Sequence, residues 1–174
     1  YTRQASYLGI VRAGSDSVVG FEVAGVLTTM EAAEGMRVAP GDTLAQLGTD
    51  RRQARLDAAS ATFNRVAAER AQAEARAERI ARLVEDGSAS AQDYDDARYA
   101  AQALLAAEHT AAAQRQSAQL ELDKSTLRAP YEAVVAERLV QTGAVVAPGT
   151  PVLRLVTAAG REAHIGVPAD VARN

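Results

Sequence analysis

The chain has 174 residues, a formal net charge of −3 at pH 7 and no cysteine. Hydrophobic residues make up 48% of it but aromatic residues only 4%, and much of the hydrophobic fraction is alanine. This composition excludes one large aromatic-rich core and favours small sheets with long helices, in which alanine lets backbones pack closely. The acidic balance argues against nucleic acid as a partner. The absence of cysteine is compatible with an oxidising compartment.

Short segments at both ends of the chain are predicted to be strands. They are YTRQASYLGIVRA, residues 1–13, and REAHIGV, residues 161–167. No apolar run approaches the roughly 18 residues of a membrane span, and no signal peptide is visible at the start. We therefore expect the chain to be a fragment of a longer protein or a mature form of it.

A repeat spaced by 108 residues organises the region between these end segments. Residues 25–47, GVLTTMEAAEGMRVAPGDTLAQL, align without a gap with residues 133–155, AVVAERLVQTGAVVAPGTPVLRL. Gly35 matches Gly143, and the tetrapeptide Val-Ala-Pro-Gly at 38–41 recurs at 146–149. A match of this length in register indicates two copies of one structural unit.

Each copy is predicted to form short strands, because apolar residues alternate and Pro-Gly pairs at 40–41 and 148–149 mark turns. Each half is too small to be stable alone, so we expect the two to pack face to face as a small β-sandwich. The segment between them must leave and return at nearly the same place. An antiparallel helical hairpin satisfies this condition, and a separate globular domain is the alternative.

The inserted segment favours the hairpin, because apolar residues recur at alternating three- and four-residue steps along two arms of roughly 34 residues, or about 50 Å each. Arg70 interrupts the stripe of the first arm, and Glu108 and Arg115 interrupt that of the second. We interpret the other faces as charged and solvated. The stripe positions are Leu56, Ala59, Phe63, Val66, Ala73, Ala77, Ile80 and Val84, then Tyr94, Ala97, Ala101, Leu104, Ala111, Ala118 and Leu122.

The turn between the arms has clear local signals. Gly87 can adopt the left-handed conformation that ends a helix. Ser90 with Asp93 predicts a capping box, and the acidic residues that follow suit the positive end of the second helix dipole. Leu83 fits a purely structural interpretation less well, because an apolar side chain at an exposed tip has little core to enter.

The stretch LRAPYEAVVAERLVQTGAVVAPG, residues 127–149, resembles the second-half signature of the lipoyl-like domain in periplasmic adaptors, the hemolysin D-like membrane-fusion proteins of tripartite efflux pumps. It has the Ala129-Pro130 pair and the later Gly143, Val146 and Gly149. It departs from the pattern at Ala133, where the family usually has glycine. The family's tip carries Arg, then Leu four residues on and Ser seven after that, and Arg79, Leu83 and Ser90 have this spacing.

The resemblance implies an α+β fold: a lipoyl-like β-sandwich of two half-motifs, split by a long antiparallel coiled-coil hairpin, with flanking strands of an incomplete β-barrel. The implied divisions are 1–17 for barrel strands and 18–50 for the first half. They continue with 51–125 for the hairpin, with its tip at about 85–91, then 126–157 for the second half and 158–174 for the start of the barrel domain.

The resemblance also implies a function without catalysis. The chain is expected to be a periplasmic adaptor, associated with the inner membrane, that links a transporter of the resistance-nodulation-division (RND) type to a TolC-like outer-membrane channel. Arg79, Leu83 and Ser90 would dock onto the channel, and the adaptor would assemble as a hexamer. An adaptor of an ABC-type efflux or type I secretion system, or a coiled-coil scaffold unrelated to export, are the alternatives.

Other chemistry has little support in the sequence. Lys124 is the only lysine, but it follows the second arm and does not occupy the tight exposed turn where carrier domains attach lipoyl or biotin. His109 and His164 have no convincing partners. We therefore predict no catalytic, cofactor-binding or metal-binding residues.

Overall fold

A computed structural model describes residues 9–13, 16–157 and 161–165, with side chains for 16–157. The chain divides into two compact units, one from residues up to Gly48 together with those from Ser125 onward, the other Thr49–Lys124. The strands are β1 Gly9–Ala13, β2 Asp16–Val19, β3 Gly25–Met30, β4 Arg37–Val38, β5 Thr43–Leu47, β6 Thr126–Arg128, β7 Ala133–Arg138, β8 Val145–Val146, β9 Leu153–Thr157 and β10 Arg161–Ile165. The helices are α1 Asp50–Glu85 and α2 Ala91–Asp123.

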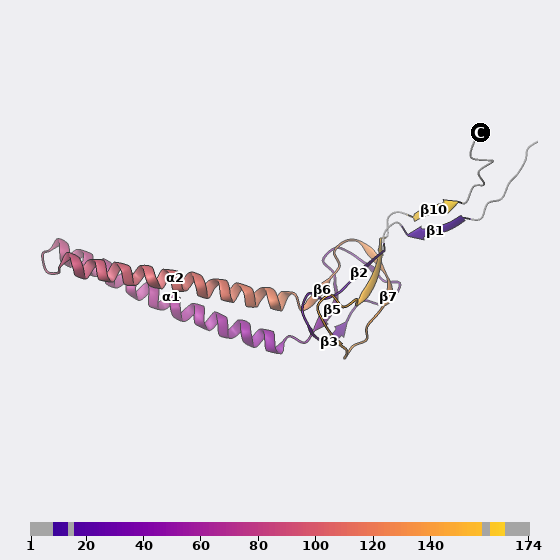
Figure 1. The fold of residues 1–174 in the computed structure, drawn as a ribbon, viewed down its shortest axis with the longest axis horizontal. Coiled ribbons are helices and arrows are strands. Elements are labelled where there is room, and N and C mark those ends of the chain that lie inside the picture. Colours follow the sequence, from indigo (N-terminus) through magenta and orange to yellow (C-terminus); the bar gives the residue numbers. More distant parts are fainter. Residues whose placement is uncertain (1–8, 14–15, 158–160, 166–174) are drawn as a thin grey trace, which may run out of the picture. The chain divides into compact units, whose positions relative to one another are not determined.

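The α+β class and the long helical hairpin are confirmed (Figure 1). The arrangement of the two repeats differs from the expected one. One four-stranded sheet has the order β2-β9-β7-β4 and the other β6-β5-β3-β8, so each sheet takes two strands from each side of the hairpin. The expectation that each half forms its own sheet is therefore wrong, because the short strands β4 and β8 pair with the opposite repeat.

Reciprocal hydrogen bonds relate the two repeats. Gly35 N donates to Val135 O at 2.8 Å, and Gly143 N donates to Leu27 O at 2.7 Å. Val135 follows Leu27 by the same 108 positions that separate the two glycines, so the bonds are equivalent under the repeat. Both glycines have positive φ, 82° and 91°, a conformation that favours glycine. The same reciprocity joins Gly41 to Ala129 and Gly149 to Phe21.

The core lies between the inner faces of the two sheets. Leu27 and Leu47 from one sheet and Val135 and Leu155 from the other are at most 1% exposed. All four belong to one cluster of buried side chains. Leu27 and Val135, and likewise Leu47 and Leu155, are separated by 108 positions, so corresponding positions of both repeats supply this core.

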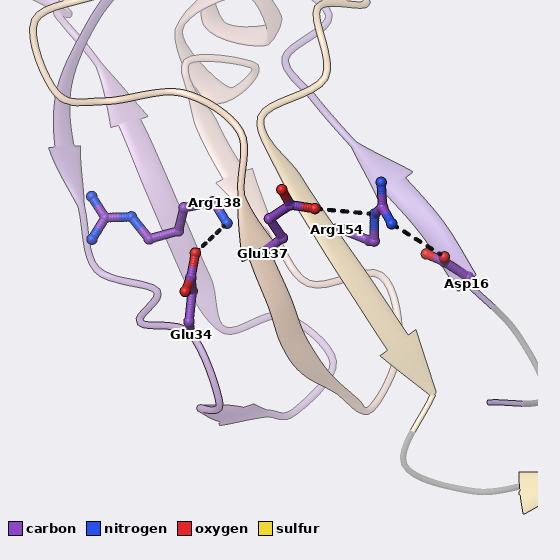
Figure 2. A network of polar contacts seen from close by, with 5 residues as sticks. All are labelled: Asp16, Glu34, Glu137, Arg138 and Arg154. Atoms are coloured by element: carbon purple, nitrogen blue, oxygen red, sulfur yellow. Dashed lines mark hydrogen bonds and ion pairs between the residues drawn. The ribbon is translucent and has the colours of Figure 1, made fainter. Parts of the chain in front are cut away.

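The outer face of the first sheet carries a row of charges (Figure 2). Arg154 on β9 lies 3.9 Å from the carboxylate of Asp16 on β2 and 3.6 Å from that of Glu137 on β7. Next to this row, the Glu34 carboxylate accepts a hydrogen bond from the backbone N–H of Arg138 at 3.0 Å. These groups are largely exposed, so we assign them a small role in stability.

The end segments form a separate two-stranded pairing, in which β1 runs antiparallel to β10 with Gly9 opposite Ile165. Asp16 and Ser17, which the family resemblance implied to be part of the barrel strands, instead belong to β2 and pair with β9. The predicted end strands also included residues 1–8 and 166–167, which lie outside the described residues. Within the described ranges, neither helix is apolar over a stretch long enough to cross a bilayer.

Gly20 provides a test of the close contact between the two halves of the β unit. A Cβ at this position would overlap the backbone carbonyl oxygen of Thr150, and backbone cannot move aside as a flexible side chain can. We expect Gly20→Ala to lower the free energy of unfolding by about 1–3 kcal/mol, measured by urea denaturation. Gly48→Ala is the matched control, since its Cβ would lie 3.5 Å from the Thr28 Cγ2 atom, an ordinary contact. Equal losses in the two variants would contradict the interpretation.

Candidate functional site

The helical hairpin contains the residues that the sequence singled out for binding. Its two helices run side by side (Figure 1). All the predicted stripe positions are buried or half-buried, with Val66, Ala97, Ala111 and Ala118 buried most deeply. The predicted seam between the helices is therefore confirmed. The three interrupting residues are also accommodated, because Arg70 forms an ion pair with Glu108 and Arg115 stacks on Phe63.

At the tip, α1 ends in a Schellman motif. Ser88 N donates to Leu83 O at 2.7 Å and Gly87 N donates to Val84 O at 3.0 Å, the 6→1 and 5→2 bonds that define the motif. Gly87 has φ 73°, so the predicted left-handed glycine is confirmed. The connection between the helices is Asp86–Ser90, within the predicted tip.

This motif explains why Leu83 is left at the surface. A Schellman motif is often closed by an apolar contact between the residue at the Leu83 position and the one at the Ser88 position. Serine offers no apolar surface for that contact, and the Leu83 side chain is 41% exposed. The hairpin therefore presents an aliphatic side chain to solvent at its apex.

The start of α2 is held by the predicted capping box. Asp93 N donates to Ser90 Oγ at 3.1 Å, and Ser90 N donates to the Asp93 carboxylate at 3.0 Å. Ser90 Oγ also donates to the same carboxylate at 2.5 Å. The hydroxyl and backbone hydrogen bonds from Ser90 lower the pKa of Asp93 below its usual 3.8.

The three predicted docking residues all lie at or near the tip. Arg79 and Leu83 are exposed and one helical turn apart, so they share a face of α1. Within the described part of the chain, the Arg79 guanidinium has no ion pair. Ser90 differs from these two, because its hydroxyl already donates to Asp93 and accepts one bond from it, leaving one acceptor site. Ser90 is therefore suited to positioning α2 more than to holding a partner.

An aromatic and cationic cluster near the tip was missed in the sequence. The Arg98 guanidinium lies 5.0 Å from the centre of the Tyr99 ring and 6.0 Å from that of Tyr94, and 3.5 Å from the Asp95 carboxylate. Contacts with Tyr99 and then the charge of Asp95 raise the pKa of Arg98. Tyr99 is 57% exposed. The four-residue spacing of Tyr94 and Arg98 was the available signal.

No cofactor or metal site is evident among the described residues. They contain no group of three or more His, Cys, Asp or Glu side chains that could hold a metal ion. His109 is an exposed helix residue. Lys124 is the C-terminal cap of α2, with its N–H donating to Leu120 O at 3.0 Å. The side chain of His164 lies outside the described part.

Comparison with known proteins gives fold relatives only. No protein-family profile and no curated protein sequence matches the chain. The membrane fusion protein Spr0693 from Streptococcus pneumoniae R6 matches with a TM-score of 0.66 and 23% identity, over 88% of this chain and 64% of that one. A MacA–MexA chimera with the Pseudomonas aeruginosa MexA α-hairpin domain matches with a TM-score of 0.61 and 20% identity, over 96% and 58%. The periplasmic adaptor protein EmrA matches with a TM-score of 0.53 and 14% identity, over 95% and 78%.

The chain thus has the fold of membrane fusion and periplasmic adaptor proteins, and the resemblance inferred from the sequence is confirmed at the level of the fold. It spans less than two thirds of the length of the first two of these structures.

The capping box gives a pH prediction. Because the folded-state pKa of Asp93 is depressed, its stabilising contribution is complete above pH 3.8 and is lost as the pH falls below that value. In an NMR titration we expect the Asp93 carboxyl to titrate below 3.8, and to move upward in Ser90→Ala, since the leading cause of the shift is removed.

Ser90→Ala should also cost about 1 kcal/mol of stability, as loss of an N-cap typically does. Ser90→Thr keeps the hydroxyl and should retain the low Asp93 pKa. An unchanged Asp93 pKa in Ser90→Ala would contradict the assigned cause.

Proposed function

We propose that the chain is part of a periplasmic adaptor of a tripartite efflux pump. The proposal rests on one combination: the fold of membrane fusion proteins together with a hairpin that leaves an aliphatic side chain exposed at its apex. In this proposal the β-sandwich is a lipoyl-like domain, and residues 1–17 and 158–174 contribute to a β-barrel domain. The chain acts by binding and catalyses no reaction.

The proposed docking site is the tip surface formed by Arg79 and Leu83, with Ser90 holding the second helix in place. Leu83 offers an apolar knob that fits a groove between the helices of a coiled-coil partner. Arg79 can donate charge-assisted hydrogen bonds to carboxylates or carbonyl groups of that partner. Arginine is among the residues enriched at protein interfaces and their hot spots.

The partners follow from the proposed role. A TolC-like outer-membrane channel would bind the tip, and an inner-membrane transporter would bind parts of the protein nearer its membrane anchor. Six adaptors would assemble side by side in the periplasm. We favour an RND transporter because the hairpin is a single pair of helices, and an ABC-type efflux or type I secretion system is the alternative.

Leu83→Ala in the full-length adaptor tests the docking site. We expect it to weaken binding to a purified TolC-like channel by about tenfold or more, measured by surface plasmon resonance. The thermal midpoint should change little, because Leu83 is 41% exposed. Arg79→Asp should weaken binding similarly by removing the donor and reversing its charge.

Leu120→Ala is the matched control, since it makes the same truncation at a 52% exposed leucine of α2 away from the tip. Equal weakening by Leu83→Ala and Leu120→Ala would place the interface along the hairpin instead of at its apex. If neither Leu83→Ala nor Arg79→Asp alters binding or drug resistance, the docking role is wrong and the scaffold alternative gains support.

A further inference from the structure

Helix α2 has two largely apolar faces, and only one of them packs on α1. The second face contains no charged residue and is exposed along its whole length, with Tyr99 57% and Leu120 52% exposed. The interpretation that every face outside the seam is charged is therefore wrong for α2. This outer stripe consists of Tyr99, Ala103, Ala106, Thr110, Ala113, Ser117 and Leu120.

The two faces offer similar apolar surface. Alanine is the commonest residue on both, and each has one tyrosine and at least one leucine. Hydrophobic burial is roughly proportional to the apolar area removed from water. Packing the outer stripe against α1 would therefore compete with packing the seam, and apolar contacts alone discriminate weakly between the two arrangements.

Charged side chains distinguish the two faces. Arg70 Nε lies 2.9 Å from Glu108 Oε2 across the seam, and the two side chains are only 32% and 17% exposed. These two atoms are shielded from solvent, and shielded charged groups need a compensating partner. Arg70 Nη2 also lies 3.5 Å from the Glu74 carboxylate within α1, so Glu108 is the partner of Arg70 across the seam but not its only one. Seven residues along each helix, the Arg115 guanidinium lies 4.2 Å from the centre of the Phe63 ring. Both polar contacts use residues of the seam face of α2.

We propose that the Arg70–Glu108 ion pair, assisted by the Arg115–Phe63 stack, selects which face of α2 packs on α1. If α1 packed on the outer stripe, Arg70 would face a surface without a carboxylate and would lose its closer counter-ion, Glu108 at 2.9 Å. It would keep only Glu74 on α1, whose carboxylate lies 3.5 Å from Arg70 Nη2. Removing one partner of a shielded ion pair costs far more than replacing both by apolar residues. The pair therefore contributes to specificity more than to stability, as single polar residues do in coiled coils.

Engineered disulfides can report the packing face, because the chain has no cysteine. Ala77 and Ala101 are seam positions, each seven residues toward the tip from Arg70 and Glu108 respectively. Ala103 lies about 200° around α2 from Ala101, on the outer stripe. Oxidation of Ala77→Cys/Ala101→Cys reports seam packing, and oxidation of Ala77→Cys/Ala103→Cys reports outer-stripe packing.

In the parent background we expect the seam disulfide to form and the outer disulfide to be rare. In Arg70→Met/Glu108→Met, the chain should remain helical and the outer disulfide should increase by about tenfold. Arg65→Met/Glu69→Met is the matched control, since it removes an ion pair of the same type that lies within α1 alone. The charge swap Arg70→Glu/Glu108→Arg should restore exclusive seam cross-linking when it is made together with Glu74→Gln, which prevents two carboxylates from facing each other four residues apart on α1.

Exclusive seam cross-linking in Arg70→Met/Glu108→Met would overturn the proposal. So would an equal increase in the Arg65/Glu69 control, or loss of seam selectivity in the charge swap. Unfolding of Arg70→Met/Glu108→Met would also overturn it, because the pair would then be needed for stability. None of these outcomes depends on the adaptor function or on a channel.

Discussion

The exchange of backbone hydrogen bonds between the two repeats is the constraint on which the rest of the structure depends. Neither repeat completes its own sheet, because β4 pairs with β7 and β8 pairs with β3. Buried backbone groups need partners, so each repeat requires the other. Leu47 N donates to Ser125 O at 2.8 Å, which holds the two ends of the insertion next to each other. A helical hairpin leaves and returns at neighbouring points, so it can connect Leu47 to Ser125 without separating them.

Local sequence signals predicted the elements well. The spacing of Gly35 and Gly143 revealed the repeat, three- and four-residue steps revealed the seam, and Gly87 with Ser90 marked the turn. The exchange of strands between sheets was not predictable in the same way, because it depends on non-local pairing of two-residue strands whose composition would fit either partner.

The polar seam residues show a second limit of sequence reasoning. Arg70 and Glu108 each looked like a defect in its own stripe, since their pairing becomes apparent only when the alignment of the two helices is known. The exposure of Leu83 was foreseen as unusual, but its cause, a serine where the Schellman motif often has an apolar partner, required the hydrogen bonds at the tip. Leu83 is thus available to the proposed docking site because serine, and not an apolar residue, occupies position 88 of the motif.

The separation of the chain into two compact units has an architectural consequence. The contacts that define the β unit involve residues outside the insertion, so arm length is free to vary without altering the β core. Adding seven residues to each arm preserves the sevenfold pattern and extends the hairpin by about 10 Å. The length of the hairpin can therefore change between related chains while the β unit stays the same.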